Sequence, residues 1–294
     1  MPVILDDLRV EIKCGVRRRP RHYNTDVTSK VANLSTRSVR YLESGSGAPI
    51  VLLHAFPLNA EQWLPQMTQV PPGWRLIAPD LRGFRQPDGT VLVPDGPAGI
   101  DAYATEVLEL MMHLEIKRAT ICGLSMGGYV ALAIWRLAAA RVAALVLADT
   151  RASADTDEAR AGRDRMIALA ETGGVSGVAR AMVPKLLGAT TQRDQPDLVE
   201  VVTRLIESNG KDGVQAALRA MRDRPDATPL LGTITCPVTV MVGMEDIATP
   251  PAECEAMHHA IHGSRFVTLP HAGHLSNIEH AFGFNWELFI AARK

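Results

Sequence analysis

The sequence predicts an α/β protein built on a mostly parallel, doubly wound β-sheet. Short, continuous apolar runs recur along the chain of 294 residues, and segments of helical periodicity lie between them. A continuous apolar run is typical of a strand that is buried on both faces, as in a parallel sheet. Regular alternation of such strands with helices indicates crossover units, in which a helix connects two parallel strands.

The strands are expected where aliphatic and β-branched residues cluster. The first runs from Ser38 to Glu43 and ends before the stretch Ser44–Gly47, which contains two glycines. The remaining apolar runs lie at residues 50–53, 75–78, 119–122, 144–147, 238–242 and 265–269. Their repeated apolar character favours a sheet that is covered by helices on both faces.

Helices are expected between these runs. Asp101 is predicted to cap a helix that continues to about Leu114. A second helix is expected over residues 126–140, and the final helix includes residues 285–292. The order of strands and helices is therefore that of a doubly wound α/β fold.

The alternation stops between Asp149 and Thr233. This stretch has helical periodicity, with apolar stripes at residues 178–186 and 198–206, and it contains no convincing strand. Helical segments that interrupt an otherwise regular series of strands indicate an insertion. We therefore expect a helical cap inserted after the strand at residues 144–147.

The chain is accordingly expected to divide into three parts. These are an N-terminal extension, residues 1–26, an α/β core, residues 27–150 and 232–294, and a helical cap, residues 151–231. The extension contains the basic cluster Arg17–His22. Because no aromatic or periodic pattern accompanies this cluster, we interpret it as part of a solvated tail.

Charge and composition exclude several kinds of partner. The 31 basic and 32 acidic residues produce no overall field that would recruit nucleic acid or an anionic membrane. No apolar run reaches the roughly 18 residues of a membrane span, and Asp6 and Asp7 stand where a signal peptide would be basic or apolar. The four cysteines show no metal-ligand spacing. We expect a cytoplasmic protein with reduced thiols.

The stretch Gly123–Gly127 has the pattern G-x-S-x-G, with Ser125 at its centre. An apolar run, residues 119–122, precedes it, and the start of a predicted helix, residues 128–132, follows it. A serine on a sharp strand-to-helix turn has its hydroxyl exposed above the sheet. The flanking glycines leave room for the neighbouring strand and helix. The pattern predicts that Ser125 is a nucleophile.

A carboxylate and an imidazole follow other predicted strands. Asp246 comes after the run at residues 238–242, and His274 comes after the run at residues 265–269. Reactive groups gather beyond the carboxyl ends of the strands in an open parallel sheet. An imidazole can remove the proton from a serine hydroxyl as it attacks, and a carboxylate holds that imidazole in the required tautomer.

With these motifs the chain resembles an α/β-hydrolase over residues 27–294. In that family a His-Gly-x motif follows the third strand, and His54–Phe56 matches it with alanine in place of glycine. Asp80–Gly83 is similar to a further family motif, which forms a structural turn. Arg85 and Gln86 follow where relatives often have Gly-x-Ser, so the next loop departs from the usual form.

The resemblance implies a Ser-Asp-His triad of Ser125, Asp246 and His274. Asp246 lies three residues beyond Gly243, as in relatives, and Gly273 precedes His274 in the Gly-His ending of the family motif. Other residues at these strand ends are alternatives: Glu245 and Asp149 for the acid, and His271 for the base. The resemblance also implies an oxyanion hole formed by the backbone N–H groups of Phe56 and Met126.

The residues around Ser125 and His54 are similar to those of small bacterial esterases and 3-oxoadipate enol-lactonases. This similarity implies a cofactor-independent serine hydrolase that cleaves a small-molecule ester or lactone through an acyl-enzyme. Carbon–carbon bond hydrolysis, perhydrolysis and slow turnover in a ligand receptor are alternatives on the same triad. The sequence contains no H-E-x-x-H metal motif and no phosphate-binding glycine loop, so we expect neither a metal nor a cofactor.

An enol-lactone substrate with a free carboxylate would favour a cation in the cap. Five basic residues of the predicted cap are available for this role: Arg160, Arg163, Arg165, Arg180 and Lys185. Acidic residues such as Glu158 and Asp164 lie among them, so a solvated helix face explains these cations equally well.

Overall fold

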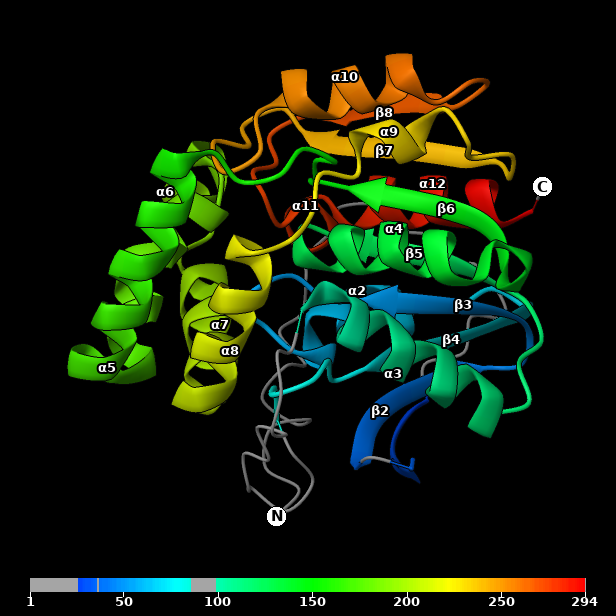
Figure 1. Cartoon of the computed structure of the whole chain (residues 1–294), viewed down its shortest axis with the longest axis horizontal. Coiled ribbons are helices and arrows are strands. Elements are labelled where there is room, and N and C mark those ends of the chain that lie inside the picture. Colours follow the sequence, from blue (N-terminus) through cyan, green and yellow to red (C-terminus); the bar gives the residue numbers. More distant parts are fainter. Residues whose placement is uncertain (1–25, 36, 86–98, 294) are drawn as a thin grey trace.

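The protein has an α/β fold built on one eight-stranded sheet. The computed structural model describes residues 26–35, 37–85 and 99–293, so the basic cluster of the predicted N-terminal extension lies outside the described residues. The strands have the order β1-β2-β4-β3-β5-β6-β7-β8 (Figure 1). They are β1 (Val27–Asn33), β2 (Ser38–Gly45), β3 (Gly47–Leu53), β4 (Gly73–Pro79), β5 (Ala119–Leu124), β6 (Val142–Ala148), β7 (Val238–Gly243) and β8 (Arg265–Leu269).

The sheet is mostly parallel, as predicted. β2 pairs antiparallel with both β1 and β4, and all the other neighbours pair in parallel. Every residue of β5 and β7 is buried, which explains the continuous apolar runs there. β1 was not predicted from the sequence. It is an edge strand whose residues are mostly exposed, so it carries no apolar run.

Helices cover both faces of this sheet (Figure 1). One face packs against α3 (Ile100–His113), α4 (Met126–Ala138) and α10 (Pro251–Ala260). The other packs against η1 (Ala60–Trp63), α2 (Leu64–Met67) and α12 (Ala281–Ala292). The short helices η2 (Ala139–Arg141) and α11 (Ser276–Glu279) lie in connections. The predicted doubly wound architecture is confirmed.

The prediction that Asp101 caps the N-terminus of α3 is wrong. Gly99 occupies the N-cap position with an extended backbone, and α3 begins at Ile100. Asp101 therefore lies inside the first turn, where its carboxylate forms an ion pair with Arg136 of α4. An acidic side chain in the first turn still interacts favourably with the positive end of the helix dipole.

Five helices and no strand occupy residues 149–237, all of which the structure describes. They are α5 (Asp157–Leu186), α6 (Ala189–Asp194), α7 (Pro196–Glu207), α8 (Lys211–Arg222) and α9 (Thr228–Leu231). α5 has a kink at Gly174, whose φ is 62°. In Figure 1, α5, α7 and α8 form a group beyond the arrowheads of the central strands. The division of the chain into core and cap at residues 150 and 231 stays a prediction.

The helical segment packs closely on loops that follow β3 and β4. The Asn209 side chain donates a hydrogen bond of 2.8 Å to the carbonyl of Pro57, and the Asn59 side chain donates one of 2.9 Å to Ser208. A Cβ atom on Gly213 of α8 would lie 1.7 Å from the carbonyl oxygen of Gly83. Only glycine allows α8 to approach the loop this closely.

Among the described residues, no helix is long and apolar enough to span a membrane.

We predict that Gly213→Ala destabilises the protein by about 1–3 kcal/mol, because the added methyl group would meet the backbone of Gly83. Gly162→Ala is the matched control, since Gly162 also lies in a helix and its Cβ would only come within 3.7 Å of the Arg165 side chain. Its stability should be unchanged or rise by up to about 1 kcal/mol. Free energies of unfolding in urea would measure both effects, and equal values for the two variants would contradict the close packing.

Candidate active site

Ser125 lies on a sharp turn between β5 and α4. Its backbone has φ 55° and ψ −113°, and its N–H donates a 2.9 Å hydrogen bond to the carbonyl of Ala148 at the end of β6. A Cβ atom on Gly127 would lie 2.0 Å from the carbonyl oxygen of Leu53, and one on Gly123 would lie 2.2 Å from that of Gly127. The two glycines of the motif therefore let the turn pack directly on β3, and Ser125 itself is half-buried.

His274 and Asp246 form a buried hydrogen bond. His274 Nδ1 lies 2.8 Å from Asp246 Oδ2, and each residue is 3% exposed. The other carboxylate oxygen, Oδ1, accepts hydrogen bonds of 2.8 Å from the N–H groups of Ala248 and Thr249. With Nδ1–H directed at the carboxylate, Nε2 is the ring nitrogen of His274 that can accept a proton.

These residues share one edge of the sheet. Ser125 follows β5, Asp246 follows β7 and His274 follows β8, and the sheet order β5-β6-β7-β8 places these strand ends on the same side. The loops after β7 and β8 also bond to each other, because Glu245 N–H donates a 2.8 Å hydrogen bond to the carbonyl of Ala272. The arrangement agrees with a nucleophile, a base and an acid drawn from separate strand ends.

His271 and Glu245, the alternatives for the base and the acid, face away from the His274–Asp246 pair. The His271 side chain is 76% exposed, and its Nδ1 lies 4.0 Å from Glu245 Oε1. Glu245 accepts hydrogen bonds from the N–H and the hydroxyl of Thr190 at 2.8 and 2.5 Å. These bonds lower the pKa of the Glu245 carboxyl. Glu245 therefore binds the start of α6.

Asp149 is fully buried at the end of β6 and has two partners of its own. Its Oδ1 accepts a 2.8 Å hydrogen bond from Gly243 N–H, and its Oδ2 accepts one from the hydroxyl of Ser276. Burial raises the pKa of Asp149 well above its usual range, and the nearby Asp246 carboxylate raises it further. The sequence did not identify the role of Ser276, because its partner lies 127 residues away.

The predicted oxyanion-hole residues lie on neighbouring turns. β3 and β5 pair with Leu53 opposite Gly123, so Phe56 and Met126 follow adjacent strands. Ala55 N–H donates to the side chain of Gln62 at 2.8 Å, which fixes the first of these turns. Neither the Phe56 nor the Met126 N–H donates a hydrogen bond to any described residue. Neither donor is therefore used by another described residue.

His54 is a structural residue of this turn. It is fully buried, its Nδ1–H donates to the carbonyl of Ala55 at 2.9 Å, and its Nε2 accepts from Leu81 N–H at 3.0 Å. Its ring also packs edge-on against Phe84, with 4.9 Å between ring centroids. Burial lowers the pKa of His54 to about 4. His54 therefore joins the turns after β3 and β4 as a neutral imidazole.

The Asp80–Gly83 motif is structural as well. Asp80 Oδ1 accepts a 2.8 Å hydrogen bond from Ala60 N–H, and Oδ2 forms a 2.7 Å ion pair with Arg40. Burial nevertheless raises the pKa of Asp80 to about 6. Gly83 has φ 86°, and its carbonyl lies against Gly213, as described above. Arg85 forms a 2.7 Å ion pair with Glu61, and Gln86 lies outside the described residues.

Most basic residues of the helical segment point into solvent. Five basic residues were considered as partners of a substrate carboxylate, and one of them, Arg163, forms a 3.0 Å ion pair with Asp155. The other four, Arg160, Arg165, Arg180 and Lys185, are exposed. No group of three or more His, Cys, Asp or Glu side chains within the described ranges is arranged to hold a metal ion.

Residues 50–285 match the Alpha/beta hydrolase family. The chain belongs to this family. It is 35% identical to a thermophilic esterase from Thermogutta terrifontis, with a TM-score of 0.83 over 90% of this chain and 98% of that one. An enol-lactonase from Burkholderia xenovorans is 28% identical, with a TM-score of 0.82 over 90% of this chain and all of the other. The 3-oxoadipate enol-lactonase 2 of Acinetobacter baylyi is 27% identical over 80% of this chain and 85% of its own length.

The buried His54 predicts a loss of stability in mild acid. Its pKa of about 4 in the folded protein lies below the 6.5 of an exposed imidazole, so the unfolded chain binds this proton first as the pH falls. The contribution of the neutral His54 to the free energy of unfolding is complete above about pH 6.5. Protonation of the unfolded chain then lowers the free energy of unfolding by about 2 kcal/mol between pH 7 and pH 5. Urea unfolding at both pH values should show a smaller decrease for His54→Gln than for the wild type. Equal decreases in the two proteins would contradict this assignment.

Proposed function

We propose that this protein is a cofactor-independent serine hydrolase that cleaves a small carboxylic ester or lactone. The observation that carries the proposal is the buried 2.8 Å hydrogen bond between His274 and Asp246, on the sheet edge where Ser125 occupies its strand-to-helix turn. The similarity to a named esterase and to two named enol-lactonases supports an acyl-transfer reaction in particular. The substrate is a small molecule, and the proposed location is cytoplasmic.

The reaction begins when Ser125 Oγ attacks the carbonyl carbon of the ester or lactone. His274 Nε2 accepts the hydroxyl proton, and Asp246 stabilises the imidazolium that forms. Because both oxygens of Asp246 already accept hydrogen bonds, the carboxylate is held in one orientation toward Nδ1. This arrangement fixes the tautomer of His274 before substrate binds.

Negative charge develops on the carbonyl oxygen in the tetrahedral intermediate. The N–H groups of Phe56 and Met126 stabilise this oxyanion, and one such donor contributes about 3 kcal/mol. Met126 is the first residue of α4, so the positive end of the helix dipole also acts on the charge. His274 then protonates the leaving alcohol and activates water, which releases the acyl group from Ser125.

We predict that Ser125→Ala lowers kcat on p-nitrophenyl esters by at least about 1,000-fold, because the acyl-enzyme cannot form. Initial rates on the acetate, butyrate and octanoate esters would measure the loss. Ser264→Ala is the matched control, because Ser264 lies before β8 at the opposite end of the strands. Equal rates in Ser125→Ala and the wild type would refute the proposed nucleophile. No turnover in any of these proteins would leave the alternatives of carbon–carbon hydrolysis or ligand reception.

The two buried aspartates at this edge should behave differently. Asp246→Asn should lower kcat by about 1,000- to 10,000-fold, because the amide favours the wrong tautomer of His274. Asp149→Asn keeps an oxygen for Gly243 N–H and an amide group for the Ser276 hydroxyl, so kcat should fall by less than about tenfold. Steady-state kinetics of the two variants would compare them. A larger loss in Asp149→Asn would make Asp149 the catalytic acid.

A further inference from the structure

A cavity lies beside α4. Its volume is about 520 Å³, within the roughly 300–1,000 Å³ that is usual for ligand pockets. The lining residues that matter for its chemistry are Ile100, Tyr129, Leu132, Arg151, Arg224 and Leu230. Ser125, Asp246 and His274 are not among the described residues that line it. We call it the flank cavity.

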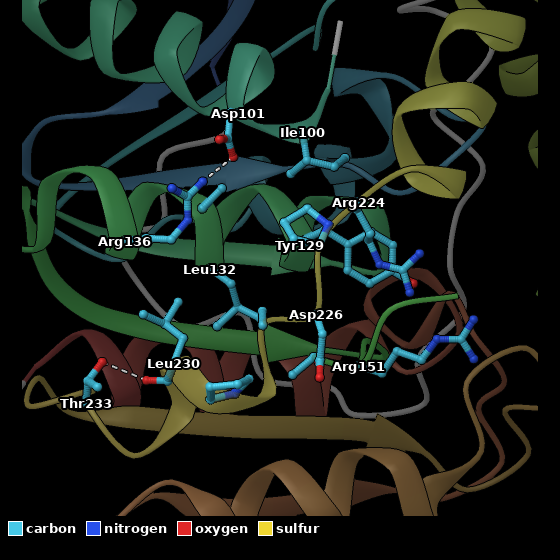
Figure 2. A pocket seen from close by; sticks show the side chains of 15 residues that line it. Ile100, Asp101, Tyr129, Leu132, Arg136, Arg151, Arg224, Asp226, Leu230 and Thr233 are labelled. Atoms are coloured by element: carbon cyan, nitrogen blue, oxygen red, sulfur yellow. Dashed lines mark hydrogen bonds and ion pairs between the residues drawn. The ribbon is translucent and has the colours of Figure 1, made fainter. Parts of the chain in front are cut away.

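The flank cavity has an apolar wall and a cationic end (Figure 2). Ile100 at the start of α3, Leu132 of α4 and Leu230 of α9 contribute aliphatic side chains. Figure 2 shows Ile100 and Leu132 between the Asp101–Arg136 pair on one side and the guanidinium groups of Arg224 and Arg151 on the other, with Leu230 beside Thr233, away from the two arginines. A ligand that fits both regions has an apolar part and an anionic group.

The two arginines at the cationic end are held by one buried carboxylate. Arg151 and Arg224 both bind Asp155 Oδ1, at 3.2 and 2.7 Å, and Arg163 binds Oδ2 at 3.0 Å. Asp155 is 5% exposed, and although burial raises the pKa of its carboxyl, Arg163 and Arg224 lower it below its usual value. Three cations thus share the Asp155 carboxylate, while Asp226, which also lines the cavity, forms no ion pair with them among the described residues.

Donor groups of both cavity-lining arginines also lack a partner. The Nε atoms of Arg151 and Arg224 are buried, and neither has a hydrogen-bond partner among the described residues. Arg224 as a whole is only 4% exposed, and its guanidinium carbon lies 4.0 Å from the centre of the Tyr129 ring. Because these Nε atoms have almost no exposed surface, the group that a ligand in the cavity can meet is the guanidinium of Arg151, whose side chain is 21% exposed and donates to Asp155 from Nη2 at 3.2 Å.

The remaining acidic groups limit the ligand to a single charge. Asp101 is paired with Arg136, and Asp226 is an exposed lining residue whose carboxylate accepts a 2.9 Å hydrogen bond from Thr228 N–H. Burial lowers the pKa of Arg151, but Tyr129, Asp155 and Glu253 together raise it above its usual value, and Glu253 forms no ion pair with Arg151 among the described residues. Asp226 repels every anion, and it repels a phosphate or a dicarboxylate more strongly than a monocarboxylate, so the monocarboxylate is favoured among anionic ligands.

We propose that the flank cavity binds a small monocarboxylate with an apolar chain, whose carboxylate lies against Arg151 and Arg224 and whose chain lies along α4. Nothing in this proposal requires Ser125 to react, so it stands independently of the proposed hydrolysis.

Calorimetric titration of the full chain with octanoate tests the proposal. We expect saturable binding with a Kd below about 1 mM, and no binding of octan-1-ol, which lacks the charge. Arg151→Gln should weaken octanoate binding by about tenfold or more, because a charge-assisted hydrogen bond is lost. Arg151→Lys keeps the charge and should recover part of the affinity.

Arg163→Gln is the matched control. Arg163 binds the same Asp155 carboxylate and is as exposed as Arg151, with side chains that are 20% and 21% exposed, but it does not line the cavity. Its loss should change the affinity for octanoate by less than about threefold. Equal losses in the two variants, an unchanged affinity in Arg151→Gln, or no saturable binding in the wild type would each overturn the proposal.

Ester hydrolysis measured with octanoate present separates the two sites. Competitive inhibition with an inhibition constant equal to the calorimetric Kd would place octanoate at the triad and overturn the proposal. Binding without competitive inhibition supports a separate site. If the protein hydrolyses none of the esters, the proposed function fails, while the calorimetric comparison of Arg151→Gln with Arg163→Gln still decides the question of the cavity.

Discussion

The carboxyl end of β6 holds together the three loops on which the proposed chemistry depends. The carbonyl of Ala148 accepts the N–H of Ser125, and the hydroxyl of Thr150 donates a 2.8 Å hydrogen bond to the Ser125 carbonyl. Between them, Asp149 accepts from Gly243, three residues before Asp246, and from Ser276, two residues after His274. Successive residues at one strand end thus fix the loops that carry Ser125, Asp246 and His274, the proposed nucleophile, acid and base.

The cost of this arrangement is a buried carboxyl group with no cation. Among the described residues, the carboxylate of Asp149 accepts hydrogen bonds from a backbone N–H and a hydroxyl and pairs with no cation, and burial raises its pKa. Asp155, which is shared by three arginines, has a lowered pKa although it is also buried. Asp80 lies between these cases, with one arginine and a pKa of about 6. Of these three acids, only Asp155, with its guanidinium partners, has a pKa below the usual value.

Local patterns allowed the fold and Ser125 to be predicted from the sequence, and the resemblance to α/β-hydrolases added Asp246 and His274. The apolar run of β5 and the glycines around Ser125 are features of a few consecutive residues, and they predict the strand and the turn. The role of Asp149 could not be predicted, because it depends on Gly243 and Ser276, which only the sheet order brings near. β1 was missed for a related reason, since its stability comes from pairing with β2 rather than from its own composition.

Contacts with the helical segment explain why acidic residues beside the triad are not equivalent to Asp246. Glu245 Oε2 accepts the N–H of Thr190 at 2.8 Å, and Glu279 Oε2 accepts the N–H of Gly188 at 2.7 Å. Both bonds hold the connection between α5 and α6 against the loops that carry Asp246 and His274. Because these carboxylate oxygens bind backbone N–H groups of the helical segment, Glu245 and Glu279 position that segment over the candidate active site. Asp246 instead meets only N–H groups of its own loop with one oxygen, and the other oxygen is left for the imidazole.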